Sequence, residues 1–144
     1  MKVLFDTSVL VAALVEPHPM HGRALPWLKQ AVGGKIEFFA AGHTLAELYA
    51  VLSTLPVTPR ISTQAALRLI HENIEAHAKV ITLTSKEYYS TVRRMADLGL
   101  PGGAIYDALI ATAAEKSAVD RLLTFKANDF RRVWPDGGTA IQTP

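Results

Sequence analysis

Short runs of mostly apolar residues alternate along the chain with longer segments of mixed character. Short apolar runs bounded by turn residues are typical of strands buried in a sheet. Five ranges have this character: Lys2 to Phe5, Ile36 to Ala41, Val80 to Leu83, Leu122 to Phe125 and Thr139 to Ile141. We predict a strand over each of them.

The segments between these runs are predicted to be helical. Their ranges are Ser8 to Leu14, His21 to Val32, Thr44 to Leu55, Thr63 to Ala78, Ser85 to Leu98 and Ala104 to Lys116. Glycine and proline support several limits, because Gly33-Gly34 ends one helix and Pro101-Gly102-Gly103 separates two others. Alternating strands and helices predict an α/β fold with a mainly parallel central sheet of four or five strands flanked by helices.

Composition fits one domain over residues 1–144. The chain is 49% hydrophobic and 19% charged, a globular balance with enough apolar material for a covered sheet. It contains no cysteine, which excludes disulfides, thiolate zinc sites and cysteine nucleophiles and suits a reducing cytoplasm. The apolar run from Val9 to Val15 is too short to span a bilayer. We therefore expect a cytoplasmic protein without a membrane segment.

Four acids fall where the predicted elements meet. Asp6 ends the first strand, Glu47 lies in the first turn of a helix, Asp107 opens another helix, and Asp129 follows the fourth strand. Ligands of an open parallel sheet bind outside the carboxyl ends of its strands, so these side chains are expected to lie together. Clustered carboxylates repel one another unless a divalent cation neutralises them. Mg²⁺ or Mn²⁺ suits such oxygen ligands and can activate water for attack on a phosphodiester.

Two of these acids also have a local structural interpretation as helix caps. Asp6 could cap the following helix, with Thr7 and Ser8 sharing the role, and local sequence gives the cap and the catalytic role about equal weight. Glu47 completes a Thr-x-x-Glu capping box that begins at Thr44, and local sequence favours the cap. Thr84 and Glu87 form a second capping box with no acid cluster nearby.

The other acids have local interpretations as well. Asp107 lies in a first helical turn, where the helix dipole favours any carboxylate, and Asp129 could pair with Arg131 or Arg132. His43 and Glu47 have the spacing of a helical metal pair, but no third nitrogen or sulfur ligand is evident, which favours a half-exposed histidine. The position of all four acids at one edge of the predicted sheet favours a shared metal site over four separate local roles.

The order of these motifs resembles the PIN-domain ribonucleases, and most closely the VapC toxins of toxin–antitoxin pairs. The resemblance rests on Val3-Leu4-Phe5-Asp6-Thr7-Ser8, Ala46-Glu47-Leu48, Ile105-Tyr106-Asp107-Ala108-Leu109-Ile110-Ala111, and Leu123-Thr124 through Asp129-Phe130. It spans nearly the whole chain. Many relatives have an amide or an acid two residues after the threonine, where this chain has Lys126. The fourth position is therefore open between Asp129 and Asn128, either of which could act through water.

The resemblance implies Mg²⁺-dependent or Mn²⁺-dependent endonucleolytic cleavage of RNA. It implies catalysis by Asp6, Glu47, Asp107 and Asp129, with the metal on Asp6 and Asp107 and with Thr7, Ser8, Thr124 and Asn128 as supporting residues. It also implies a homodimer and inhibition by a small antitoxin of the VapB kind. Two alternatives stay open: a PIN-like module that binds RNA or protein without cleaving, and more distantly a Mg²⁺-dependent phosphatase.

Positive charge is concentrated in the second half of a chain whose formal net charge is +2 and whose pI is about 9.0. An acidic cleft repels RNA unless basic groups flank it. We therefore hypothesise that Lys126, Arg131 and Arg132 hold RNA phosphates beside the metal. Arg93 and Arg94 are the next candidates. For any one of these residues alone, a solvated helix face is the simpler interpretation.

Overall fold

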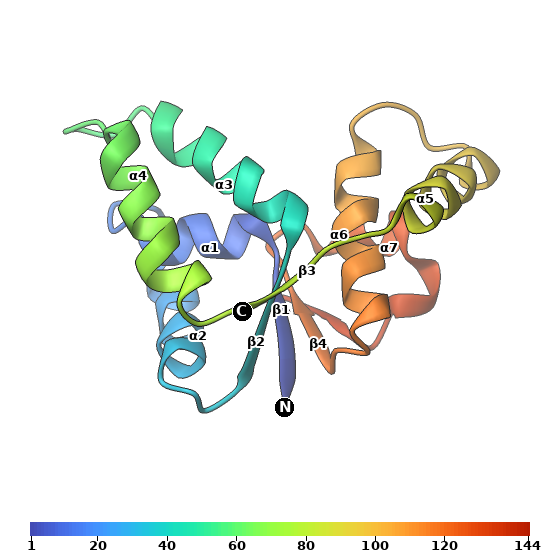
Figure 1. Cartoon of the computed structure of the whole chain (residues 1–144), viewed down its shortest axis with the longest axis horizontal. Helices are drawn as coiled ribbons and strands as arrows, with labels where there is room; N and C mark the ends of the chain where they lie inside the picture. The colour runs from blue at the N-terminus through green and yellow to red at the C-terminus, as the bar shows by residue number, and fades with distance from the viewer.

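The centre of the molecule is a five-stranded sheet in which every neighbouring pair of strands is parallel, as seen in the computed structural model of residues 1–144 (Figure 1). The strands are β1 (Lys2–Phe5), β2 (Glu37–Ala41), β3 (Lys79–Ile81), β4 (Arg121–Leu123) and β5 (Ile141–Gln142). Their order is β3-β2-β1-β4-β5. The chain thus adds β2 and β3 on one side of β1, and then returns to add β4 and β5 on the other side. In such sheets the reversal point beside the first strand is where ligands bind.

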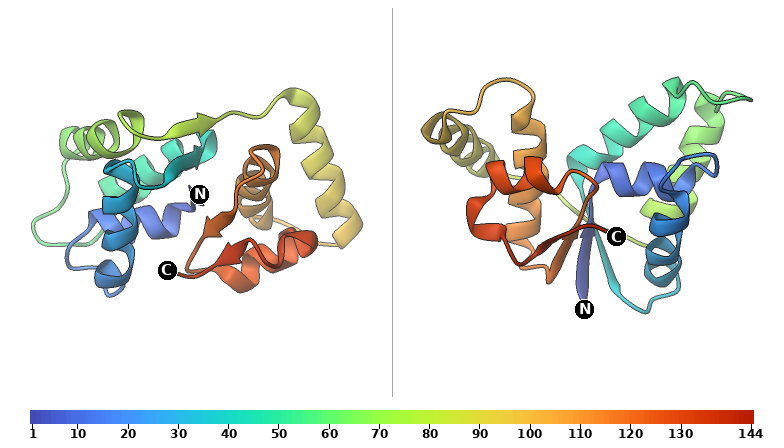
Figure 2. Two further views of the ribbon diagram at one scale, coloured as in Figure 1. Left: turned by 90° about the horizontal axis from the view of Figure 1, so that it is seen from below. Right: turned by 180° about the vertical axis from the view of Figure 1, so that it is seen from behind.

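Helices cover both faces of the sheet (Figures 1 and 2). One layer contains α1 (Thr7–Leu14), α2 (His21–Val32), α3 (Gly42–Thr54) and α4 (Thr63–Ile70), followed by a π-helical turn, His71–Glu75. The other layer contains α5 (Ser85–Leu98), α6 (Ala104–Lys116), α7 (Ala127–Val133) and a 3₁₀ turn, Pro135–Gly137. No helix is both long enough and apolar enough to cross a membrane.

The double layer explains why β1 is apolar from its second residue to its end. Val3 and Phe5 of β1 pack into one core with the α1–α4 layer, whereas Leu4 packs into a second core with the α6–α7 layer. All three side chains are fully buried. A strand with a helical layer on each face has no position left for a solvated side chain, so polar residues begin where the strand ends. In β1 that position is Asp6.

The predicted α/β architecture is confirmed, and most predicted ranges agree with the structure within one or two residues. Two predictions about helices were wrong. The single helix predicted over Thr63 to Ala78 ends as α-helix at Ile70 and continues as the π-turn. No helix was predicted after the fourth strand, yet α7 is there, held by Phe130 and Val133 in the second core. Asp129 and Asn128 therefore lie on a helix and not in a loop.

Candidate active site

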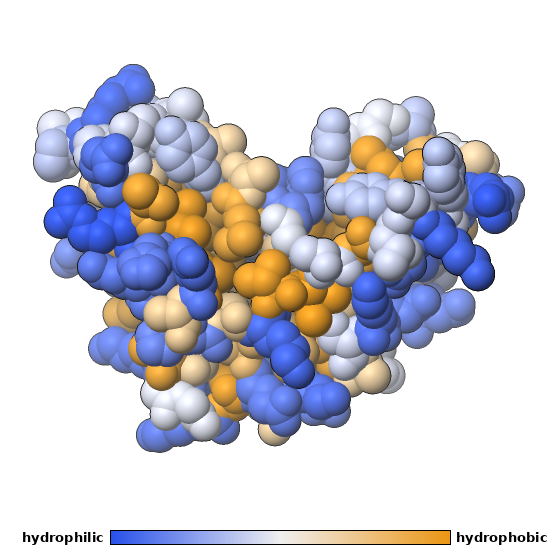
Figure 3. Space-filling model, viewed as in Figure 1, coloured by the Kyte–Doolittle hydropathy of each residue, from blue (hydrophilic) through white to orange (hydrophobic).

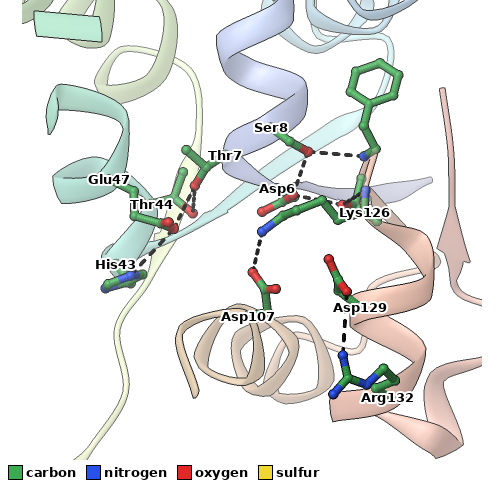
Figure 4. Close-up of polar contacts among 12 residues, drawn as sticks. Asp6, Thr7, Ser8, His43, Thr44, Glu47, Asp107, Lys126, Asp129 and Arg132 are labelled. Carbon is green, nitrogen blue, oxygen red and sulfur yellow. Dashed lines mark hydrogen bonds and ion pairs between the residues drawn. The ribbon is translucent and has the colours of Figure 1, made fainter. Parts of the chain in front are cut away.

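Asp6 lies at the carboxyl end of the central strand, where the sheet order reverses, and its side chain is almost wholly buried (Figure 4). It occupies the N-cap position of α1 but makes no capping hydrogen bond with its side chain. The Asp6 carboxylate is directed instead across the sheet toward the segment that follows β4. The interpretation of Asp6 as a side-chain cap is therefore wrong.

Two hydroxyl groups hold the Asp6 carboxylate in place. Ser8 Oγ donates to Asp6 Oδ2 at 2.7 Å, and Thr124 Oγ1 donates to the same oxygen at 2.8 Å. Each hydroxyl in turn accepts a backbone N–H from the β4–α7 connection, Ser8 from Phe125 at 3.1 Å and Thr124 from Lys126 at 2.9 Å. Because every hydroxyl both donates and accepts, the network fixes Asp6 relative to both strands.

The second Asp6 oxygen, Oδ1, is buried and has no hydrogen-bond partner. Burial raises the pKa of the Asp6 carboxyl, and it outweighs the Ser8 hydroxyl, the Lys126 charge and the Thr124 hydroxyl, which lower the pKa. The negative charge of Asp107 raises the pKa further. A buried anionic oxygen without a partner is costly unless a cation or a donor approaches it. Asp6 Oδ1 is therefore a candidate cation ligand.

Glu47 projects from α3 toward the same opening (Figure 4). Its Oε1 accepts a hydrogen bond from the Thr7 hydroxyl at 3.0 Å and lies 3.5 Å from His43 Nε2. The capping box predicted for Thr44 and Glu47 is absent, because α3 begins directly after β2 and has no side-chain cap. Thr44 is fully buried instead, with its hydroxyl oxygen 3.3 Å from that of Thr7. The second predicted capping box, formed by Thr84 and Glu87, is present with both of its hydrogen bonds.

Asp107, in the first turn of α6, does not face an empty opening. Its Oδ1 accepts a hydrogen bond from the Lys126 ammonium at 2.7 Å, and its side chain is 14% exposed. Burial alone would lower the pKa of Lys126, but the hydrogen bond to Asp107 and the charges of Asp6, Asp107 and Glu47 outweigh it, so this pKa is raised. Lys126, which we expected to flank the acids, lies among them. The only indication in the sequence was that this chain has Lys126 where many members of the resembled family have an amide or an acid.

The last two predicted groups lie at the edge of the cluster. Asp129, on α7, has a half-exposed side chain 3.9 Å from Arg132 Nη1. Asn128 Oδ1 accepts a hydrogen bond from Arg131 at 3.1 Å. The structure thus brings Asp6, Glu47 and Asp107 together around Lys126, while Asp129 and Asn128 each have an arginine partner on their own helix.

Two surface features surround the cluster. A pocket of about 290 Å³ lies beside the acids and is lined in part by Thr7, Ser8, Glu47, Phe125 and Lys126. Next to Glu47, the ring of His43 stacks on that of Tyr106, with centroids 5.2 Å apart and planes within 3°. No motif in the sequence predicted this pair, which joins α3 to α6.

A larger pocket lies elsewhere. It measures about 570 Å³, lies between α3, β3 and α5, and is lined mainly by apolar side chains, Leu45, Val80, Ile81, Leu83 and Leu109 among them. Figure 3 shows apolar surface between the two lobes on the face it displays. This pocket has few polar groups with which to perform chemistry, so we place the candidate site at the acids.

The carboxylates around Asp6 are the groups that could hold a divalent cation. No three His, Cys, Asp or Glu side chains approach closely enough to enclose a metal ion. Asp6 Oδ1 and the Asp107 carboxylate nevertheless offer hard oxygen ligands of the kind that Mg²⁺ prefers, and Mg²⁺ usually keeps several waters beside one or two carboxylates. The residues therefore fit an ion that is held by two carboxylates and water.

Comparison with known proteins agrees with this architecture. The family model for the PIN domain matches residues 3–133. The chain is 37% identical over 109 residues to ribonuclease VapC27 of Mycobacterium tuberculosis, covering 76% of this chain and 74% of that protein. It is 32% identical over 119 residues to ribonuclease VapC40 of the same species, covering 83% and 82%.

Solved structures share the fold at lower sequence identity. VapC20 of M. tuberculosis, whose structure is described as that of a toxin that cleaves the sarcin-ricin loop, matches with a TM-score of 0.71 at 15% identity, over 89% of this chain and 92% of that one. VapBC2 of Rickettsia felis, bound to a DNA fragment from its promoter, matches with a TM-score of 0.66 at 19% identity, over 100% and 99%. With its acids at the reversal point of a five-stranded parallel sheet, and with these relatives, the chain belongs to the PIN-domain family.

Proposed function

We propose that this chain is a metal-dependent endoribonuclease and the toxin of a toxin–antitoxin pair. The observation that carries the proposal is the convergence of Asp6, Glu47 and Asp107 at the reversal point of the sheet, with one Asp6 oxygen buried and unpartnered. The names of the relatives at 37% and 32% identity support the choice of RNA as the substrate.

The proposed mechanism assigns a separate task to each group. Asp6 and Asp107 would hold Mg²⁺ or Mn²⁺, which when bound supplies charge neutralisation for the phosphate and a water that is easier to deprotonate. Ser8 and Thr124 hold Asp6 through one oxygen, Oδ2, and leave the other, Oδ1, without a partner. Glu47, held by Thr7, is placed to accept a proton from the attacking water.

The basic residues and Asp129 have outer roles in this proposal. Arg131 and Arg132 on α7, together with Lys126, would meet RNA phosphates at the edge of the acid cluster. Asp129, or Asn128 in its place, would act through water, because each already contacts an arginine on its own helix.

The proposed partners follow from the relatives. The R. felis structure is a VapBC2 complex and another neighbour is FitAB bound to DNA, with a TM-score of 0.68 at 17% identity. We infer a small antitoxin of the VapB kind as the protein partner of this chain, and a homodimer as its state in solution. Sedimentation of the purified chain with and without the product of an adjacent short gene measures both.

The test of the function is cleavage of a mixed RNA pool by the purified protein. Wild type should cut with Mg²⁺ or Mn²⁺ and stop cutting after exhaustive chelation. Asp6→Asn should be inactive, while Glu87→Gln, which changes a carboxylate far from the cluster, should cut like wild type. Full cleavage in the presence of chelator, with contaminating nucleases excluded, refutes metal dependence.

A PIN-like module that binds RNA without cleaving it is the second candidate. The observation that favours it is the Lys126–Asp107 ion pair, which uses a carboxylate that the metal needs. RNA binding without cleavage at any Mg²⁺ or Mn²⁺ concentration would decide for this candidate. The phosphatase alternative is weaker, since Ser8 stands where a second acid would be needed and its hydroxyl already serves Asp6.

A further inference from the structure

The Lys126 ammonium lies at the electrostatic centre of the acid cluster. It donates to Asp107 at 2.7 Å, and the charges of Asp6, Asp107 and Glu47 all act on it. These three carboxylates come from the β1–α1 junction, α3 and α6, so the ammonium is the point at which three separate elements direct negative charge. Figure 4 shows its side chain reaching across the opening from the α7 side to Asp107.

The backbone of Lys126 is fixed in a way that aims this side chain. Its N–H donates to Thr124 Oγ1, the same hydroxyl that holds Asp6. The ammonium also lies 5.9 Å from the centre of the Phe130 ring, which is fully buried. The backbone of Lys126 is thus hydrogen-bonded to the network around Asp6, and its ammonium is hydrogen-bonded to Asp107. The flexible side-chain stem joins these two contacts.

A cation in this position has two consequences for a divalent ion. The Asp107 oxygen that Lys126 uses is one of the few hard ligands in the opening, so the two cations compete for it. The positive charge also repels a second cation at close range, and this repulsion is weakly screened because the groups are partly buried. A lysine stem, unlike a buried ligand, can rotate out toward solvent, and this side chain is already 41% exposed.

We propose that Lys126 is a built-in counter-ion that occupies the acid cluster until a divalent cation displaces it from Asp107. This role rests on the proposed metal site and adds a regulatory step to it. Without metal, the ammonium neutralises the carboxylates and stabilises the fold around them. When metal binds, the Lys126 ammonium leaves Asp107 and moves to the edge of the acid cluster. There it can contact a phosphate of the substrate. Lys126 is a positioning residue for the metal and not a ligand.

The test measures metal binding directly, without RNA. Titration calorimetry with MnCl₂ on the chelator-treated full chain should show that Lys126→Met binds Mn²⁺ at least tenfold more tightly than wild type. Lys126→Arg, which keeps the charge, should bind like wild type or more weakly. The thermal midpoint of Lys126→Met should lie below that of wild type without metal and approach it when Mn²⁺ is saturating.

Lys116→Met provides the matched control. Lys116 pairs with Glu87 at 2.8 Å, a contact of the same kind outside the acid cluster, so its loss should leave the Mn²⁺ affinity unchanged. If Lys126→Met binds Mn²⁺ with wild-type affinity or more weakly, the counter-ion role is overturned while the metal site stands. If neither wild type nor any variant binds Mn²⁺, the proposed metal site falls, and this role falls with it.

Discussion

Replacing Glu47 by glutamine separates the contribution of this residue to folding stability from its proposed role in catalysis. Glutamine keeps the size of the side chain and one oxygen, so the Thr7 hydroxyl can still donate to it. The loss is the difference between a charge-assisted and a neutral hydrogen bond, ~1 kcal/mol. The partly exposed contact with His43 contributes at most about 1 kcal/mol more.

Relief of repulsion among the carboxylates acts in the opposite direction, so we expect a net destabilisation of ~1 kcal/mol without metal. For a chain of this size, that shift lowers the thermal midpoint by about 2–4 °C. Folding is therefore expected to survive the change, and the variant can be compared with wild type under the same conditions.

The metal-dependent part should change far more. Removing a full negative charge near the ion should weaken Mg²⁺ binding at least tenfold, or ~1.4 kcal/mol. At a Mg²⁺ concentration of about one hundred times the wild-type dissociation constant, binding stabilises wild type by ~2.7 kcal/mol and the variant by ~1.4 kcal/mol. The metal-induced rise in thermal midpoint should thus be halved, and RNA cleavage at low Mg²⁺ should fall by orders of magnitude.

The assay pairs thermal unfolding with RNA cleavage across a Mg²⁺ titration, for wild type, Glu47→Gln and Glu87→Gln. Glu87 is the control because it is a glutamate in a true capping box outside the cluster. If Glu47→Gln responds to Mg²⁺ and cuts RNA like wild type, the catalytic assignment of Glu47 is refuted.

Three further outcomes are expected. Joint replacement of Lys126, Arg131 and Arg132 by alanine should flatten the salt dependence of RNA binding by roughly 0.7 in log–log slope for each true phosphate contact, and an unchanged slope would direct attention to other basic residues. The Glu87 pKa is lowered from 4.5 to about 2, chiefly by its hydrogen bond with a lysine. Its stabilisation is therefore present above pH 4.5 and lost as the pH falls toward about 2, and urea unfolding at pH 5 and pH 3 should show a smaller loss for Glu87→Gln than for wild type. Phe130→Ala should cost about 3–5 kcal/mol in urea unfolding, because this buried ring holds α7 on the sheet, and a cost below about 1 kcal/mol would contradict that packing.

The ranges of the strands along the chain and the position of Asp6 were predictable, because a strand covered on both faces is apolar until it ends. In β1, apolar residues continue until the strand ends, and the first polar side chain marks the edge where ligands bind. The same reasoning placed Asp107 correctly at the start of α6. These features depend on local sequence and on topology rules that hold for most parallel sheets.

Glu47 and Lys126 could not be assigned in the same way, because their contacts span the chain. The Thr44–Glu47 spacing fits a capping box, yet Thr44 turns to Thr7, which lies 37 residues earlier. Lys126 reaches Asp107 over 19 residues. The helix α7 was missed because its polar start resembles a loop and only tertiary burial of Phe130 stabilises it. In each case a distant partner outweighs the local preference.

The place of β1 at the middle of the sheet has a consequence for synthesis of the chain. β1 is made first, but its neighbour β4 begins at Arg121, and one of the two hydroxyls that hold Asp6 belongs to Thr124, 118 residues after it. A nascent chain that has emerged as far as α6 already contains Asp6, Glu47 and Asp107. It still lacks strands β4 and β5 and Lys126. Chains released early by the ribosome therefore lack the strand beside β1 and the Thr124 hydroxyl that orients Asp6, so under the proposed function we expect them to be inactive.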